Sequence, residues 1–314
     1  MKEVLERSAV GTAVPQAKGI CLYGDSGFGK TTQLGIFAKW LYARTGKPVR
    51  VISAEDSSKS ILEPLINVGV VDYYNLTKVK DPVAELRDLA AGKWPVDGTW
   101  QPYIPGSHSG YGLDGLSSIA ESLMEDAREN HRFLQGQTQN VYTIGGHKVS
   151  AATQQGYGFV QDEMIRAVRA FASLDGVQRV MWTAHEVKSE DADHLNLRGP
   201  AIVGKAKTPA VQKYFGMVLH LDGITDASQK TTRQLWFTRH LDPKIKDVYY
   251  PAKVTIPLSQ VETLLKRFPG GFITPTATFG IDALLDAEVE LQSVETNSLR
   301  DWKASIDAKF KQQS

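Results

Sequence analysis

Short apolar runs alternate with amphipathic segments along the first part of the chain. The apolar runs predict buried strands at residues 19–23, 48–54 and 70–76. Apolar positions with helical spacing predict helices at residues 30–46, 61–68 and 82–92. Strands and helices that alternate in this way indicate an α/β fold with a mostly parallel central sheet flanked by helices.

The later part of the chain is less regular. Residues 93–112 and 130–156 are rich in small and polar residues, and we expect loops there, on either side of a helix at 116–129. The later elements that we predict are a helix at 160–174, strands at 179–184 and 217–221, a turn or short helix at 211–215, and a late β-hairpin in which 235–238 pair with 254–256. Beyond a Gly/Thr/Pro-rich stretch, residues 282–314 predict an acidic, helical C-terminal tail.

The charge balance excludes a strong global attraction to nucleic acid or to membranes. The 36 Lys and Arg residues stand against 35 Asp and Glu residues, so any contact with a polyanion must be a local patch. Cys21 is the only cysteine, which excludes an intrachain disulfide and a cysteine-cluster zinc site, so a metal would be held by oxygen ligands. No apolar run approaches about 18 residues, so we expect a cytoplasmic protein without a membrane segment.

One segment matches the phosphate-binding pattern G-x-x-x-x-G-K-[ST] without a mismatch, between a predicted strand and a predicted helix. It consists of Gly24, Asp25, Ser26, Gly27, Phe28, Gly29, Lys30 and Thr31. Its glycines let backbone N–H groups face the phosphates, and the N-terminus of the following helix adds its dipole. We expect Lys30 to reach the β- and γ-phosphates, Thr31 to offer a hydroxyl to Mg²⁺, and Thr32 to complete the site.

Glu55 follows the second predicted strand. A carboxylate at the carboxyl end of a strand beside the phosphate loop lies where a general base can polarise water, because ligand crevices open at that edge of the sheet. The alternative is that Glu55 caps the next helix, a role that Asp56 or Ser57 fills equally well. The sequence leaves both interpretations open.

Asp114 is the best candidate for the aspartate that orders Mg²⁺. The residues before it, 109–113, lack the usual apolar run and contain two glycines. Asp114 therefore ends either a short, glycine-softened strand or a turn, and the helical segment that follows favours the strand. His185, after the predicted strand 179–184, is placed to report the state of the γ-phosphate to the next loop, although a lone histidine is often a structural residue.

Together these residues resemble the RecA-like P-loop ATPases and, more narrowly, a phage nucleotide-binding AAA-domain family that includes RecA-core single-strand annealing proteins. The resemblance rests on GDSGFGKTT (24–32), SAED (53–56), LDGLSS (113–118), VMWTAHE (180–186), GPAIVGKAKTPAV (199–211), and HLDP followed by YPAK (240–253). It implies that ATP and Mg²⁺ bind, that Glu55 activates water, that Asp114 orders the metal, and that the segment 183–185 is a sensor. The implied domains are an N-terminal extension (1–18), a RecA-like ATPase domain (19–268), and a linker with a helical tail (269–314).

The resemblance also implies work on DNA. An acid-free run after the sensor strand could follow a single-stranded phosphate backbone, with Tyr214 and Phe215 to stack on bases; its basic residues are Arg198, Lys205, Lys207 and Lys213. A solvated basic loop packed beside its own sheet is the alternative. Lys244 and Lys246 are candidates to reach a neighbouring subunit's nucleotide in a homo-oligomer.

Three classes of function remain open. The first is an ATP-driven protein of recombination or replication, which would assemble as a ring or filament and work with phage or host proteins in the host cytoplasm. The second is an ATPase switch that acts on a protein partner as a loader or assembly factor. The third, a small-molecule kinase, is the least favoured because no arginine-rich lid segment stands out.

Overall fold

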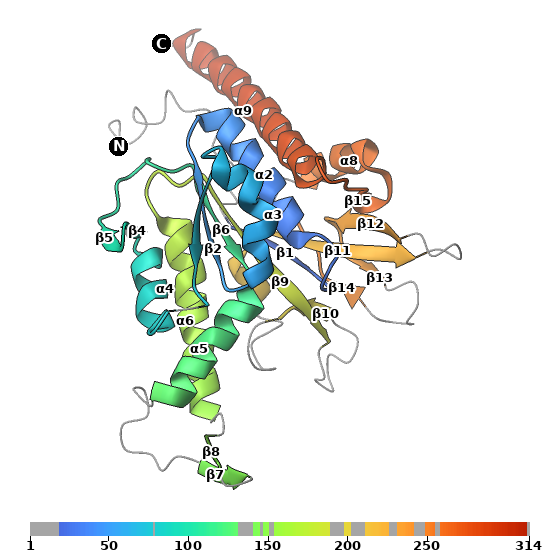
Figure 1. The fold of residues 1–314 in the computed structure, drawn as a ribbon. Coiled ribbons are helices and arrows are strands. Elements are labelled where there is room, and N and C mark those ends of the chain that lie inside the picture. The colour runs from blue at the N-terminus through green and yellow to red at the C-terminus, as the bar shows by residue number, and fades with distance from the viewer. Residues whose placement is uncertain are drawn as a thin grey trace.

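The computed structural model describes residues 19–77, 79–130, 141–144, 147–150, 154–188, 198–201, 211–225, 231–241, 249–254 and 258–312. Its central feature is one large sheet with the order β15-β12-β11-β1-β9-β6-β2-β3 (Figure 1). The strands are β1 (Gly19–Gly24), β2 (Val49–Ser53), β3 (Val71–Asn75), β6 (Gly110–Asp114), β9 (Arg179–Lys188), β11 (Met217–Thr225), β12 (Thr231–Trp236) and β15 (Phe272–Ile273). Neighbours from β3 to β11 pair in parallel, which confirms the predicted α/β fold with a mostly parallel sheet.

Helices cover both faces of this sheet. They are α2 (Lys30–Thr45), α3 (Asp56–Asn67), α4 (Pro82–Ala90), α5 (Leu116–Asn130), α6 (Gln154–Ser173), α8 (Leu258–Arg267) and α9 (Ile281–Gln312). Short antiparallel pairs join β4 (Trp94–Val96) to β5 (Thr99–Gln101), β7 (Val141–Ile144) to β8 (His147–Ser150), and β13 (His240–Leu241) to β14 (Tyr249–Tyr250), and β10 (Arg198–Pro200) pairs with the end of β9.

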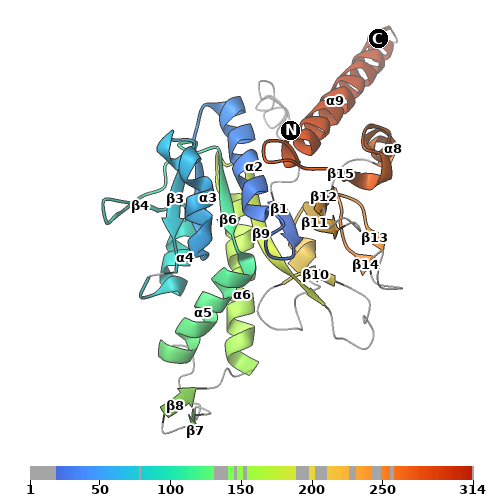
Figure 2. The ribbon, with the colours of Figure 1, turned by 45° about the vertical axis from the view of Figure 1, so that its right-hand side comes forward.

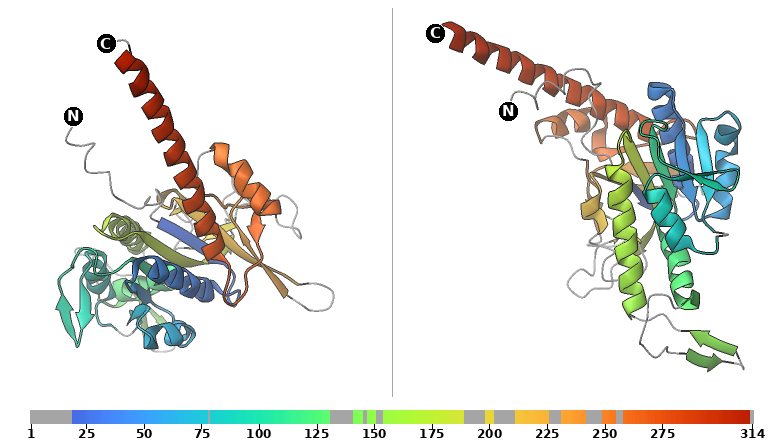
Figure 3. Two further views of the ribbon diagram at one scale, coloured as in Figure 1. Left: turned by 90° about the horizontal axis from the view of Figure 1, so that it is seen from above. Right: turned by 90° about the vertical axis from the view of Figure 1, so that its left-hand side faces the viewer.

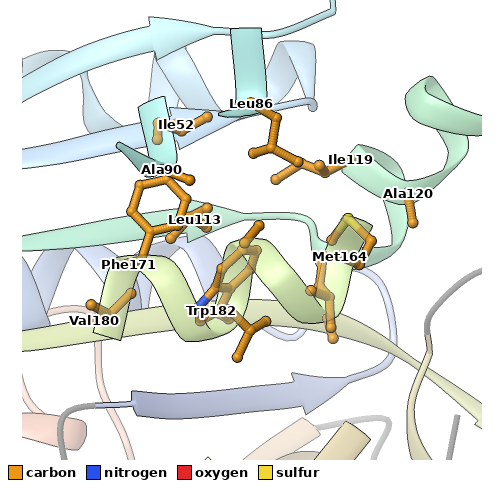
Figure 4. Packing of buried hydrophobic residues seen from close by; sticks show 14 of the residues in the cluster. Ile52, Leu86, Ala90, Leu113, Ile119, Ala120, Met164, Phe171, Val180 and Trp182 are labelled. Carbon is orange, nitrogen blue, oxygen red and sulfur yellow. The ribbon is translucent and has the colours of Figure 1, made fainter. Parts of the chain in front are cut away.

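Two hydrophobic cores hold the layers together. On one face, Trp182 and Leu113 pack with residues of α4, α5 and α6, among them Phe171 (Figure 4). On the other face, Ile20 and Leu22 pack with residues of α2, α3 and α9. Because both faces of β1 are buried, this strand (GICLYG) is a continuous apolar run rather than an alternating one.

The predicted late hairpin has different partners. Leu235 of β12 pairs with Leu221 of β11 and with Ile273 of β15, so the prediction that 235–238 pair with 254–256 is wrong. The three residues are all buried, and pairing them extends the apolar layer of the main sheet. Residues 255–256 lie outside the described part of the chain. Figure 2 shows β11, β12, β15, α8 and the start of α9 gathered on one side of the molecule.

The last helix begins inside the fold and then leaves it (Figure 3). Buried Arg179 donates to Glu288 at 2.6 Å, and the backbone N–H of Ile281 donates to Gln33 Oε1 at 2.9 Å. Farther along, Val294 is 61% exposed. Part of the segment expected to be linker and tail therefore belongs to the sheet and the core. None of the helices in the ranges described above is long and apolar enough to cross a membrane.

Candidate nucleotide-binding site

The phosphate-binding loop connects β1 to α2. The first N–H groups of α2 have no intrahelical partners, and no acidic residue lies in its first turn, so this helix end favours an anion. Lys30 is 8% exposed, and its Nζ donates to the carbonyls of Gly24 at 2.9 Å and Asp25 at 2.8 Å. Burial lowers the pKa of Lys30, against the opposing influence of nearby carboxylates, among them Glu55. The loop therefore holds a desolvated cation at the point where phosphates are expected.

Asp114 ends β6 and is fully buried, so the strand interpretation is confirmed and the turn interpretation is wrong. Its Oδ2 accepts hydrogen bonds from Thr31 Oγ1 at 2.8 Å and Ser58 Oγ at 2.6 Å. Its Oδ1 accepts one from Thr183 Oγ1 at 2.5 Å. Burial raises the pKa of Asp114, while these three hydroxyl donors lower it. Asp114 thus joins the phosphate loop to β9 and α3.

The glycines that obscured β6 in the sequence have a packing reason. A Cβ atom added at Gly112 would lie 2.7 Å from Leu34 Cδ1. The first turns of α2 therefore lie so close to β6 that a side chain has no room there. The contact fixes the start of α2, and with it Lys30 and Thr31, against the strand that ends at Asp114.

Glu55 is the first residue after β2 and occupies the N-cap position of α3, but its side chain makes no capping hydrogen bond. Its Oε1 instead accepts from Ser118 Oγ at 3.2 Å and lies 3.4 Å from His185 Nε2. The hydrogen bond from His185 lowers the pKa of Glu55 and outweighs burial, which acts in the opposite direction. The helix-cap interpretation therefore has no support from the side chain, and Glu55 is a half-buried, ionised carboxylate at the edge of the site.

Sheet topology explains why these residues meet. Parallel pairing places Ser53 beside Asp114, and Gly24 beside His185. The carboxyl ends of β1, β2, β6 and β9 therefore lie along one edge of the sheet, which is where open α/β sheets bind ligands. Lys30, Glu55, Asp114 and His185 converge there, although up to 155 positions separate them in the sequence.

The oxygen donors at this edge fit Mg²⁺. The ion prefers oxygen ligands and is usually held by one or two protein groups together with water and phosphate oxygens. Thr31 Oγ1 and Asp114 Oδ2 are adjacent and supply such groups. Among the residues that the structure describes, no group of three or more His, Cys, Asp and Glu side chains could hold a metal ion.

Sequence reasoning missed a second polar network, immediately behind the site. Glu186 Oε1 accepts from Arg198 at 2.9 Å, and its Oε2 lies 3.1 Å from His220 Nε2. Arg198 also donates to Tyr250 Oη at 2.8 Å. Because the Arg198 side chain is 14% exposed and bound to Glu186, it is a structural residue here, not a free contact for DNA phosphates.

The other residues predicted to contact DNA divide into two groups. Lys213 is exposed, with its Nζ 5.1 Å from the centre of the Tyr214 ring, but Phe215 is buried in the core and has no face to offer a base. Phe215 is therefore wrong as a stacking partner, because the end of η2 (Gln212–Tyr214) turns it inward. The remaining predicted lysines lie outside the described residues: Lys205, Lys207, Lys244 and Lys246.

Comparison with known proteins identifies a family for the chain. A search among curated proteins finds no match for the chain. A family model described as an AAA domain matches residues 16–242, which is more than half of the chain and includes the phosphate loop, Glu55, Asp114 and His185. With the loop between β1 and α2 and the oxygen donors of Thr31 and Asp114, this match shows that the chain belongs to the AAA-domain family and carries a P-loop NTPase-type domain.

Proposed function

We propose that the protein hydrolyses ATP and uses that cycle to act on single-stranded DNA in recombination or replication, as a RecA-like protein of phage type. The observation that carries the hydrolysis is the placement of Glu55, held by Ser118 and His185 rather than by a helix cap, at the same sheet edge as Lys30. A carboxylate held in this position lies where a general base can polarise water.

The residues divide the chemistry among them. Lys30 exchanges its loop carbonyl partners for the β- and γ-phosphates, and Thr31 and Asp114 would hold the Mg²⁺ ion, which neutralises charge on the phosphates. Glu55 accepts a proton from water as the water oxygen bonds to the γ-phosphorus. The bond from the γ-phosphorus to the bridging oxygen breaks, ADP carries away that electron pair, and phosphate leaves.

His185 connects this chemistry to the predicted DNA segment. Its ring lies beside Glu55, while its backbone N–H donates to Ser117 Oγ at 3.2 Å and its carbonyl accepts from the N–H of Ala201 at 2.7 Å. Ala201 immediately precedes the segment that contains Lys205 and Lys207. A change at Glu55 therefore reaches the base of that segment through two hydrogen bonds, which supports the proposal that nucleotide state controls DNA binding.

Measurement of nucleotide binding and ATP turnover, with and without single-stranded DNA, tests the proposal. Lys30→Ala should abolish turnover, because alanine cannot replace the positive charge with which the lysine stabilises the transferred phosphate. Lys205→Ala/Lys207→Ala should weaken DNA binding and flatten its salt dependence by about 0.7 per lost phosphate contact, with basal turnover retained. The matched control is Lys266→Ala/Lys303→Ala, which removes the same charge from α8 and α9.

The outcomes separate the alternatives. Unchanged turnover in Lys30→Ala would remove ATP hydrolysis from the account. Intact hydrolysis that neither DNA nor Lys205 and Lys207 affect would contradict the DNA role and favour the switch that acts on a protein partner.

We also propose that the active form is a homo-oligomer in which Lys244 and Lys246 reach a neighbour's nucleotide. Mixtures of Lys30→Ala subunits with Lys244→Ala/Lys246→Ala subunits should regain activity at interfaces that keep both an intact loop and an intact donor. A strictly monomeric protein with full ATPase activity would contradict this part of the proposal.

A further inference from the structure

The antiparallel pair β11–β12 packs directly onto the phosphate loop. The Phe28 ring of the loop occupies the place of a side chain at Gly223, because a Cβ added there would lie 2.7 Å from Phe28 Cε1. Gly223 pairs with Arg233 across the two strands. Directly opposed residues of an antiparallel pair share one face of the sheet, so Arg233 lies on the face that meets the loop.

Arg233 reaches the loop beside the residue that precedes Lys30. A Cβ added at Gly29 would lie 3.4 Å from Arg233 Nη1 and 3.8 Å from Thr32 Oγ1. The Arg233 side chain is exposed, and no carboxylate among the described residues forms an ion pair with it. The Arg233 guanidinium, which has no carboxylate partner among the residues that the structure describes, therefore lies over the start of α2, next to a hydroxyl of the first helical turn.

The balance of charges around the loop favours an additional cation at this position. Asp25, Glu55 and Asp114 bring three carboxylates to the loop, and Lys30 is the one cation that the sequence motif supplies. A triphosphate adds further negative charge, and in loops of this type the backbone cradles the α- and β-phosphates while the lysine serves the β- and γ-phosphates. A guanidinium presents its N–H groups in a planar fork that suits phosphate oxygens.

The geometry points to Arg233 as a nucleotide-binding residue that contacts the α- or β-phosphate from within the same chain. This inference rests on the proposed nucleotide site and adds a contact that the phosphate-loop motif does not contain. It also gives the β11–β12 extension a role in the site, with Phe28 fixing the loop against the strands and Arg233 closing over the phosphates.

Two probes, ADP and inorganic pyrophosphate, test the inference by direct binding measurements. Arg233→Ala should weaken both by about tenfold or more, as expected for the loss of a hydrogen bond between charged groups. Arg233→Lys keeps the charge but not the fork, and should recover part of the loss. Arg300→Ala, which removes the same charge from an exposed position of α9, should bind both probes as the wild type does. Thermal unfolding without nucleotide should be the same for all four proteins.

Each contrary outcome has one meaning. If the wild-type protein binds neither probe, the proposed nucleotide site itself fails. If the wild type binds and Arg233→Ala matches Arg300→Ala, the inference is overturned while the proposed function stands. Weaker binding of ADP with unchanged binding of pyrophosphate would place Arg233 on the base or ribose, which also overturns it. A lower unfolding temperature without nucleotide, equal in Arg233→Ala and Arg233→Lys, would make the residue structural.

Discussion

In the proposed mechanism, the pairing of Glu55 with His185 sets the pH range in which hydrolysis can occur. A carboxylate whose pKa is depressed in the folded protein stays ionised until the pH falls through that depressed value, so Glu55 remains a base well below neutrality. Lys30, Ser118 and His185 face it and lower its pKa, while burial raises the pKa. His185→Ala should therefore move the acid limb of turnover to higher pH. Profiles of kcat against pH, each scaled to its own maximum, check this, and superimposable acid limbs would contradict it.

Gly115 leaves room for the Glu55 side chain. Its φ is +88°, and a Cβ added there would lie 2.8 Å from Glu55 Oε1. Gly115→Ala should cost about 1 to 2 kcal/mol of stability from backbone strain and should also lower kcat by displacing Glu55. Gly46→Ala is the matched control, because Gly46 has φ +66° but nothing within 4 Å of its Cβ position. Urea denaturation measures the stability of both variants, and a steady-state assay measures their turnover. Equal turnover in the two variants would show that the position of Glu55 does not depend on this space.

At the scale of elements, Glu186 ties the end of β9 to β10 and β11. Burial opposes its ionisation, but hydrogen bonds and charge from His220 and Arg198 outweigh burial and lower its pKa. Glu186→Gln should therefore destabilise the fold by about 1–3 kcal/mol at neutral pH, because two buried donors lose a charged acceptor. This stabilisation is present above pH 4.5, the ordinary pKa, and is lost as the pH falls through the depressed value. Denaturation measured at pH 7 and at pH 4 should show that the difference in free energy of unfolding between Glu186→Gln and the wild type is smaller at pH 4. A difference that does not change with pH would argue against ionisation of Glu186 as its source.

The last helix has two parts with different roles. Its first turns bury Ile281 and Leu285 and pair Glu288 with Arg179, whereas Val294 and the later described side chains are exposed. A chain that ends after residue 293 should keep its thermal midpoint within a few degrees. A chain that ends after residue 280 should lose several kcal/mol of its free energy of unfolding, because the buried Arg179 then has no carboxylate partner in Glu288. Thermal unfolding of the two shortened chains tests this prediction. Equal midpoints would mean that the first turns of α9 do not stabilise the fold.

At the scale of the whole molecule, local signals predicted the sheet and the loop. Strand β1 is an apolar run, and the phosphate loop is a contiguous motif, so neither requires knowledge of distant contacts. Residues that act through distant pairing were not visible. Ser58 is an ordinary hydroxyl until α3 lies beside the end of β6, and the role of Arg233 follows only when β12 pairs with β11 rather than with the segment near residue 254.

The same reason explains the errors. The glycines of β6 looked like a loop because the helix that excludes their side chains lies elsewhere in the sequence. Phe215 and Arg198 looked available because the partners that bury them come from other elements.

We propose that this site hydrolyses ATP with Glu55 as the general base. The decisive measurement is the steady-state ATP turnover of Glu55→Gln, together with its affinity for ADP. Glutamine keeps the size of the side chain and removes its basicity, so we expect ADP affinity to remain and kcat to fall by about 10²-fold or more. Unchanged kcat in Glu55→Gln, with wild-type turnover measurable, would contradict the account.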